Sequence, residues 1–154
     1  MIQRIQTLFL LAVSLLVGIL LFVPLATVSF NDIIYKVKAD SLVNMMNNGE
    51  AEIMFWPLFI LLIIMMMIPF ATIFLFKKRL LQVRLTVFSS ILDLSFYGLF
   101  IYEMFSISKV MEGATFNYYY PALAVPACCI ILNLISIKKI MQDEILVKSY
   151  DRIR

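Results

Sequence analysis

Asp93 is the residue whose type and position could most readily support chemistry, because it interrupts a long apolar stretch. It follows Arg84, the last basic residue before that stretch, by nine positions, which on a helix is about 13 Å. A charged carboxylate at that depth in a bilayer costs at least about 2.5–3.5 kcal/mol, so we expect Asp93 to be buried among helices and neutral. It would then either hold helices together, which we favour, or relay a proton or an ion.

Other polar and aromatic residues share a helix face with Asp93. Ser89, Asp93 and Tyr97 follow one another at intervals of four residues, so on a helix they form one stripe. Asn133, in the last apolar stretch, lies about one turn from Asp93 in depth and could make an interhelical hydrogen bond worth about 1 kcal/mol. We therefore predict an intramembrane polar site formed by Asp93, Tyr97, Ser89 and Asn133.

The remaining side chains with catalytic or metal-binding potential are poorly arranged. Cys128 and Cys129 point about 100° apart on a helix, and the sequence has no histidine and no CxxC motif. Met65–Met67 likewise splay around a helix and cannot bind one soft metal ion together. The sequence also lacks a nucleophile–base pair, a glycine-rich phosphate loop and paired catalytic carboxylates. We therefore expect no enzymatic activity, no metal and no cofactor.

Four apolar stretches must position these residues, and each is long enough for a helix that crosses about 30 Å of hydrocarbon. They are Thr7–Val28, Met54–Phe76, Leu85–Phe105 and Tyr118–Ile137. With 63% hydrophobic residues, 15% charged residues and a mean hydropathy of +0.97, a soluble chain of 154 residues would expose large apolar patches. We therefore predict an all-α membrane protein, a four-transmembrane-helix bundle forming a single domain over residues 1–154.

The distribution of lysine and arginine predicts the orientation. Placing the N-terminus, the loop between the second and third stretches and the C-terminal tail on one side leaves only Lys36, Lys38 and Lys109 opposite. By the positive-inside rule both termini are then cytoplasmic. The alternative is that residues 1–28 form a cleaved signal peptide. That apolar run is too long for a typical signal and lacks a small-x-small cleavage site, so we expect an uncleaved helix.

The first extracytoplasmic segment, Ser29–Ile53, has its own pattern. Thr27–Phe30 and Ile33–Lys38 are β-prone runs separated by an Asn-Asp pair, which favours a tight turn. We predict a short β-hairpin there, followed by a brief helix over Leu42–Met46. The second extracytoplasmic segment is expected over Ile107–Asn117.

Aromatic residues stand where helices should meet the outer membrane interface. Trp56 opens the second helix, and Tyr118–Tyr120 precede the fourth. Tryptophan and tyrosine are enriched at this depth because their rings are amphipathic. We interpret these residues as depth anchors rather than as a ligand cage.

The cytoplasmic face is the most strongly patterned part of the sequence. A basic connection joins the second and third helices, and opposite charges at helical spacing, Lys139/Asp143 and Glu144/Lys148, favour a helical tail over residues 138–154. Charge beside membrane segments is explained by topology and anionic lipid, so we expect no nucleic-acid partner. The candidate docking residues for anionic lipid or a protein partner are Lys77, Lys78, Arg79, Arg84, Asp143, Glu144 and Arg152.

Three sequence blocks resemble the signatures of a known family. They are Met1–Thr7, Ile73–Leu85 and Asp143–Arg154. The chain resembles small four-helix membrane proteins of unknown function from Bacteroidota. The resemblance implies a bacterial inner-membrane location and the same four-span layout, and it brings no activity and no catalytic residues. All three blocks fall on the predicted cytoplasmic face.

These observations predict a non-enzymatic accessory or scaffold protein that docks a membrane or cytoplasmic partner through its basic loop and charged tail. The alternative is a small proton- or ion-coupled transporter or channel that uses Asp93. A water-accessible polar cavity around Asp93, Tyr97 and Asn133 would favour the alternative. The sequence does not predict the oligomeric state.

Overall fold

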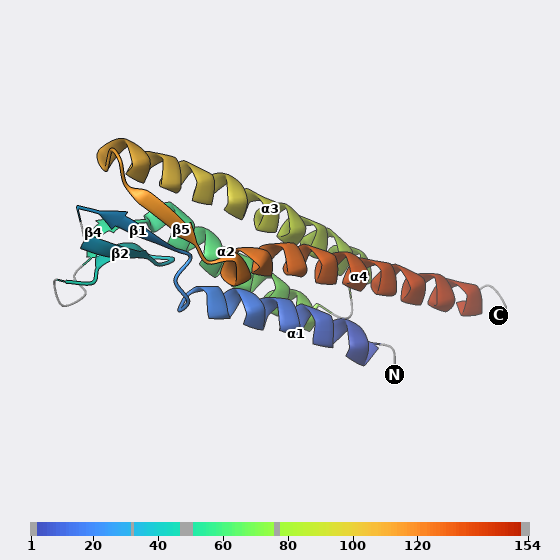
Figure 1. Ribbon diagram of the computed structural model, residues 1–154. Helices are drawn as coiled ribbons and strands as arrows, with labels where there is room; N and C mark the ends of the chain where they lie inside the picture. The colour runs from blue at the N-terminus through green and yellow to red at the C-terminus, as the bar shows by residue number, and fades with distance from the viewer. Residues whose placement is uncertain (1–2, 32, 47–50, 76–77, 152–154) are drawn as a thin grey trace.

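The computed structural model describes residues 3–31, 33–46, 51–75 and 78–151 (Figure 1). Within them the elements follow one another as α1 (Gln3–Leu20), β1 (Ala26–Phe30), β2 (Ile33–Val37), β3 (Ser41–Asn44), β4 (Ala51–Met54), α2 (Trp56–Phe74), α3 (Arg79–Val110), β5 (Thr115–Tyr118) and α4 (Tyr120–Asp151). Three of the four helices, α2, α3 and α4, are long and apolar enough to cross a membrane.

Each helix buries one narrow stripe, at alternating intervals of four and three residues. This spacing repeats every seven residues and is the pattern of helices that pack side by side at a shallow angle. The stripes consist of Gln6, Leu10, Val13, Val17 and Leu20 on α1; Leu58, Leu62, Met65, Pro69 and Thr72 on α2; Gln82, Thr86, Ser89, Asp93, Phe96 and Phe100 on α3; and Ala122, Pro126, Cys129, Asn133, Ser136 and Ile140 on α4.

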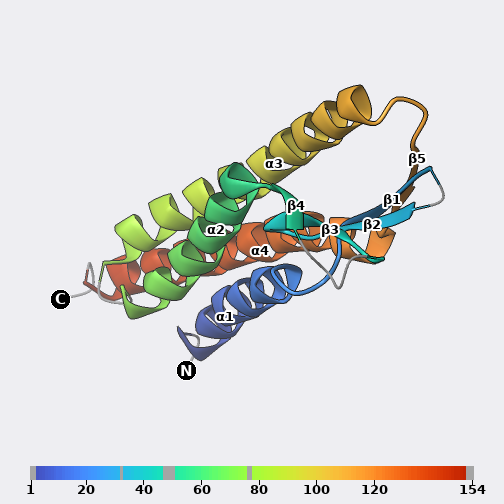
Figure 2. The ribbon, with the colours of Figure 1, turned by 90° about the vertical axis from the view of Figure 1, so that its left-hand side faces the viewer.

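The helices contact one another in a closed order. α1 packs against α2 and α4, and α3 packs against the same two helices from the other side. Both termini and the turn from α2 to α3 lie at one end of the helices, and the strands lie at the other end (Figures 1 and 2). The two ends of the molecule therefore differ in structure as well as in sequence.

The five strands form one antiparallel sheet in the order β4-β3-β2-β1-β5. β1 and β2 pair as the predicted hairpin, in which Phe30 pairs with Ile33 and Asn31 adopts a positive φ of 50°. On its other side β1 pairs with β5, so that Thr27 lies opposite Asn117. The sheet therefore joins the segment between α1 and α2 to the segment between α3 and α4.

The sheet corrects the all-α prediction, although a mostly helical chain is confirmed. The predicted brief helix over Leu42–Met46 is wrong, because Ser41–Asn44 form β3 and bury all four side chains. The apolar Leu42 and the β-branched, apolar Val43 suit a strand that is covered on both faces. The second segment expected outside the membrane, Ile107–Asn117, contains the last turn of α3 and most of β5.

The helix boundaries differ most at α1 and α3. The expected helix 7–28 ends at Leu20, because Pro24 disfavours helical backbone at Val23 and the following residues are needed for β1. The expected helix 85–105 extends over Arg79–Val110, and Gly113, with a φ of +85°, turns the chain just beyond it. α2 keeps nearly its expected range, 54–76. The expected helix 118–137 and the helical tail form one helix, α4, as far as Asp151.

The apolar core runs from the middle of the helices into the sheet without interruption. Val13 and Val17 of α1, Leu58 and Leu62 of α2 and Phe96 of α3 belong to one cluster with Leu25, Val28, Val37 and Leu42 of the sheet region. The sheet is thus packed on the helices. An isolated hairpin would be marginal, and this packing supplies the burial that stabilises it.

Candidate functional site

Asp93 of α3 and Asn133 of α4 are joined across the helix interface. The side-chain amide of Asn133 donates one hydrogen bond to Asp93 Oδ2 at 3.0 Å and another to Ser89 Oγ at 3.3 Å. All three side chains are completely buried, with 0% exposed surface. Because an amide has two hydrogens, one Asn133 side chain satisfies both partners. The structure therefore brings together three of the four residues of the predicted polar site.

Three polar atoms near this contact have no hydrogen-bond partner among the described residues. They are Asp93 Oδ1, Asn133 Oδ1 and Ser136 Oγ. A buried polar group without a partner is costly, so such atoms call for a proton, a water or an ion. A protonated Asp93 would turn one of these acceptors into a donor. Chemically, the cluster of Ser89, Asp93, Asn133 and Ser136 can hold a proton on the Asp93 carboxyl between α3 and α4.

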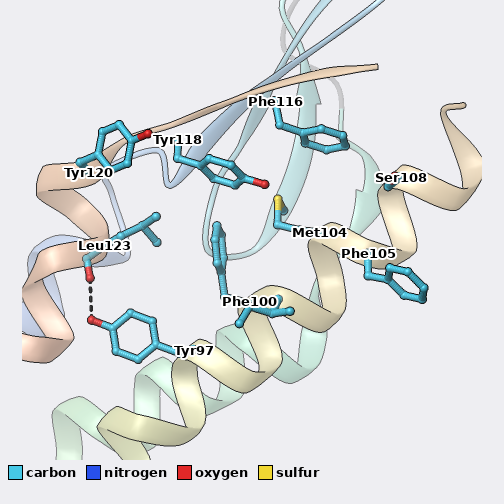
Figure 3. A pocket seen from close by; sticks show the side chains of 10 residues that line it. Tyr97, Phe100, Met104, Phe105, Ser108, Phe116, Tyr118, Tyr120 and Leu123 are labelled. Atoms are coloured by element: carbon cyan, nitrogen blue, oxygen red, sulfur yellow. Dashed lines mark hydrogen bonds between the residues drawn. The ribbon is translucent and has the colours of Figure 1, made fainter. Parts of the chain in front are cut away.

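Tyr97, the fourth residue of the predicted site, makes a different contact. Its hydroxyl donates to the carbonyl of Leu123 at 2.7 Å (Figure 3). The same hydroxyl accepts from the backbone N–H of Ala127 at 3.1 Å. In an uninterrupted helix these two backbone groups would pair with each other. Tyr97 therefore bridges the backbone of α4, one turn of α3 closer to the sheet than Asp93.

Pro126 explains why α4 accepts a side chain at this point. Proline lacks an N–H, so the carbonyl of Ala122 loses its usual donor and the helix is weakened over that turn. Side chains inserted into the backbone ladder are a recognised cause of helix bending. The sequence signal was present in Pro126, but without the register of α3 on α4 it could not be linked to Tyr97.

An aromatic cleft of about 520 Å³ opens between the C-terminal half of α3, β5 and the start of α4 (Figure 3). It is lined by Tyr97, Phe100, Ile101, Met104, Phe105, Ser108, Phe116, Tyr118, Tyr120 and Leu123. The rings of Phe100 and Tyr118 meet edge to face, with centroids 6.3 Å apart. Ligand pockets in proteins typically have volumes of about 300–1,000 Å³ and mainly apolar linings. The aromatic cleft has both properties.

The aromatic cleft is not predicted from the sequence. There, Tyr118 and Tyr120 are interpreted only as depth anchors, and Tyr97 is assigned to the polar site around Asp93. What creates the space is β5, which pairs with β1 and so holds Phe116 and Tyr118 beside α3. That pairing joins residues about 90 positions apart, and no local pattern reveals it.

Four basic side chains are exposed at the end of the helices that carries the termini: Lys78, Arg84, Lys138 and Lys139. We call them the basic band. The Asn133–Ser89 hydrogen bond fixes the antiparallel register of α3 and α4, and Arg84 precedes Ser89 by as many residues as Lys138 follows Asn133. Arg84 and Lys138 therefore lie at the same level, on two neighbouring helices.

The other candidate docking residues are less well defined. Arg79 is half-buried at the start of α3. Lys77 and Arg152 lie outside the described residues, and Asp143 and Glu144 belong to α4 although their side chains lie outside the described part. Of the docking residues named from the sequence, the structure thus describes the side chains of Lys78, Arg79 and Arg84, and it places Lys138 and Lys139 at the same end of the helices.

The two cysteines are free, with Cys128 exposed and Cys129 buried. Their side chains lie on different sides of α4, as adjacent residues of a helix must. Over the part of the chain that the structure describes, no three acidic, cysteine or histidine side chains gather as a metal site. The buried cluster around Asp93 is therefore the best candidate for a functional site.

Comparison with known proteins identifies the family. The family model "Domain of unknown function (DUF4293)" matches residues 2–153, nearly the whole chain. The chain belongs to the DUF4293 family. No curated protein matches it. The family description carries no activity, so the function of this DUF4293 chain has to be argued from its own residues.

Proposed function

We propose that the chain is a non-enzymatic accessory or scaffold protein of the bacterial inner membrane, and that it docks a protein partner at the basic band. It crosses the bilayer four times as one domain, with both termini in the cytoplasm and the sheet outside. Three helices with membrane-spanning length and composition support this layout, as does α1, which packs along α2 and α4. The bilayer, with anionic lipid at its cytoplasmic face, surrounds the helices.

The observation that carries the proposal is the position of the basic band. Lys78, Arg84, Lys138 and Lys139 are exposed together at the end that holds both termini, and α4 continues beyond them as a helix (Figure 1). Positive charge next to a membrane also attracts anionic lipid, at about 1 kcal/mol per residue. The part of α4 that continues past the basic band is not required for binding lipid. Its presence therefore favours a protein partner.

Purification in a mild detergent tests the docking proposal. Replacing the four basic-band residues by glutamine should remove a partner that co-purifies stoichiometrically with the wild type. The matched control is Lys36→Gln, Lys38→Gln and Lys109→Gln, which removes basic residues from the opposite end and should leave the partner bound. Because charge removal can change topology, insertion of each variant is checked first. A correctly inserted basic-band variant that keeps the partner, or a wild type without one, refutes docking.

Proton- or ion-coupled transport is the alternative function, and the three unpartnered atoms around Asp93 and Asn133 favour it. The complete burial of Asp93, Asn133 and Ser89 favours the structural role, since a relay must exchange its proton or ion with water on both sides. The interhelical hydrogen bonds of Asn133 supply what helix association in lipid requires. We therefore keep the scaffold as the proposal and test Asp93 separately.

A further inference from the structure

The aromatic cleft has a direction along α3. Tyr97, Ile101, Phe105 and Ser108 follow one another at intervals of four, four and three residues, so they form a ridge parallel to the helix axis. At 1.5 Å per residue this ridge is about 16 Å long. The hydrocarbon of one membrane leaflet is about 15 Å thick, half of the full 30 Å. The aromatic cleft therefore has the length of an acyl chain that stands upright in one leaflet.

The cleft also has an apolar end and a polar end. Figure 3 shows Tyr97 and Leu123 at one end of the cleft and Ser108 at the other, with Phe100, Met104 and the Tyr118 hydroxyl between them. The Tyr97 hydroxyl is already hydrogen-bonded to the backbone of α4, so the end at Ser108 is the one that offers a hydroxyl to an occupant. An occupant with an apolar chain and a polar head matches this division.

A positive charge stands at the polar end. Lys109 is exposed, and its Nζ lies 4.5 Å from the centroid of the Phe105 ring, which lines the cleft. Ser108, the neighbouring residue, is part of the lining itself. A phosphate held near Ser108 could accept a hydrogen bond from its hydroxyl and form an ion pair with Lys109.

The cleft is open where lipid would reach it. Ile101 and Phe105 keep 66% and 60% of their surface exposed, although both line the cleft. In a chain that crosses a membrane, apolar surface at this depth is in contact with lipid. We propose that the aromatic cleft binds one acyl chain of an anionic phospholipid from the outer leaflet, with Lys109 and Ser108 holding the phosphate. This inference rests on the membrane-spanning layout proposed above and on none of the docking argument.

Fluorescence quenching by brominated phospholipids tests the inference. Trp56→Phe removes the sole tryptophan, and Phe105→Trp then places a reporter in the cleft at an exposed position where an aromatic ring and the stacked Lys109 can remain. Ile60→Trp in the same background is the matched control, because Ile60 is an exposed residue of α2 that does not line the cleft. Both reporters are measured in vesicles of mixed brominated and unbrominated lipid.

A specific site and ordinary surrounding lipid give different results. At position 105 we expect brominated phosphatidylglycerol to compete with unbrominated lipid about fivefold better than brominated phosphatidylcholine does. One nearby cation provides a preference of this size for the anionic headgroup. Lys109→Gln should abolish this preference, and position 60 should show none. The inference is overturned if the preference for phosphatidylglycerol is the same at positions 105 and 60. It is also overturned if the preference at position 105 survives Lys109→Gln.

The controls separate this inference from the proposed membrane layout. Quenching at position 60 without quenching at position 105 means that protein or peptide fills the cleft, which refutes the lipid site and leaves the layout intact. Absence of quenching at both positions refutes the membrane layout and the lipid site together. A further control tests whether the headgroup alone is enough for binding. Glycerol phosphate is added as a competitor, and it should not displace the brominated lipid.

Discussion

Tyr97 illustrates how a single hydroxyl can support a helix that its own sequence weakens. It lies between the carbonyl of Leu123 and the N–H of Ala127, one residue after Pro126. Tyr97→Phe keeps the ring and removes both hydrogen bonds, so we expect a loss of about 1–2 kcal/mol in the free energy of unfolding. Thermal unfolding in detergent measures the loss. Tyr102→Phe removes a hydroxyl from an exposed side chain of the same helix and should have no effect; equal stability of both variants would contradict the bridge.

Asp93 calls for a substitution that separates structure from chemistry. Asp93→Asn retains an oxygen that accepts the hydrogen bond from the Asn133 amide, so we expect stability within about 1 kcal/mol of the wild type and unchanged function. Asp93→Leu removes one of the two hydrogen-bond partners of the buried Asn133 amide and should cost about 1–3 kcal/mol. Unfolding in detergent and complementation of a deletion strain report the two properties. A stable Asp93→Asn protein that has lost function would instead support the transport alternative.

At the scale of elements, the strand β5 has the largest influence on the aromatic cleft, because Phe116 and Tyr118 line it. Its pairing with β1 can be tested by disulfide formation in a variant with Cys128 and Cys129 replaced by alanine. Thr27→Cys with Asn117→Cys joins residues that lie directly opposite, within the 4.4–6.8 Å that disulfides allow between Cα atoms, and should oxidise readily. Thr27→Cys with Thr115→Cys is displaced by two residues and should oxidise slowly. The reverse order would show that the register is wrong.

Elements dominated by local patterns were predictable from the sequence, and those set by distant pairing were not. The apolar run of α2 and the antiparallel pairing of β1 with β2 lie close to their expected positions. The hydrogen bond between Asp93 and Asn133 agrees with the similar membrane depths that the sequence predicts for the two residues. Ser41–Asn44 became a strand because β2 and β4 flank it, and a single sequence does not contain that information. The same holds for Phe116 and Tyr118, whose place in the cleft depends on β1.

At the scale of the whole molecule, the separation of the sheet from the termini makes topology testable. In the same cysteine-free background, Met46→Cys places a thiol at an exposed position of the sheet region and Gln142→Cys places one on exposed α4. An impermeant maleimide added to cells with a permeabilised outer membrane should label position 46 and spare position 142. Labelling of position 142 alone would invert the proposed orientation. Ser41, in the same region, is not a suitable labelling position, because its side chain is buried in the sheet.

The β1–β5 ladder also determines the order in which this chain can mature. A ribosome delivers β1 long before β5, since Ala26–Phe30 and Thr115–Tyr118 are separated by α2 and α3. Until the second half of the chain has been synthesised, β1 has hydrogen-bonding groups on its outer side that β2 cannot satisfy. The sheet is thus left open during synthesis and closes only after α3 and β5 have been delivered. A nascent chain that stalls after α2 would expose a strand edge for which a chaperone, or another unfinished copy, could compete.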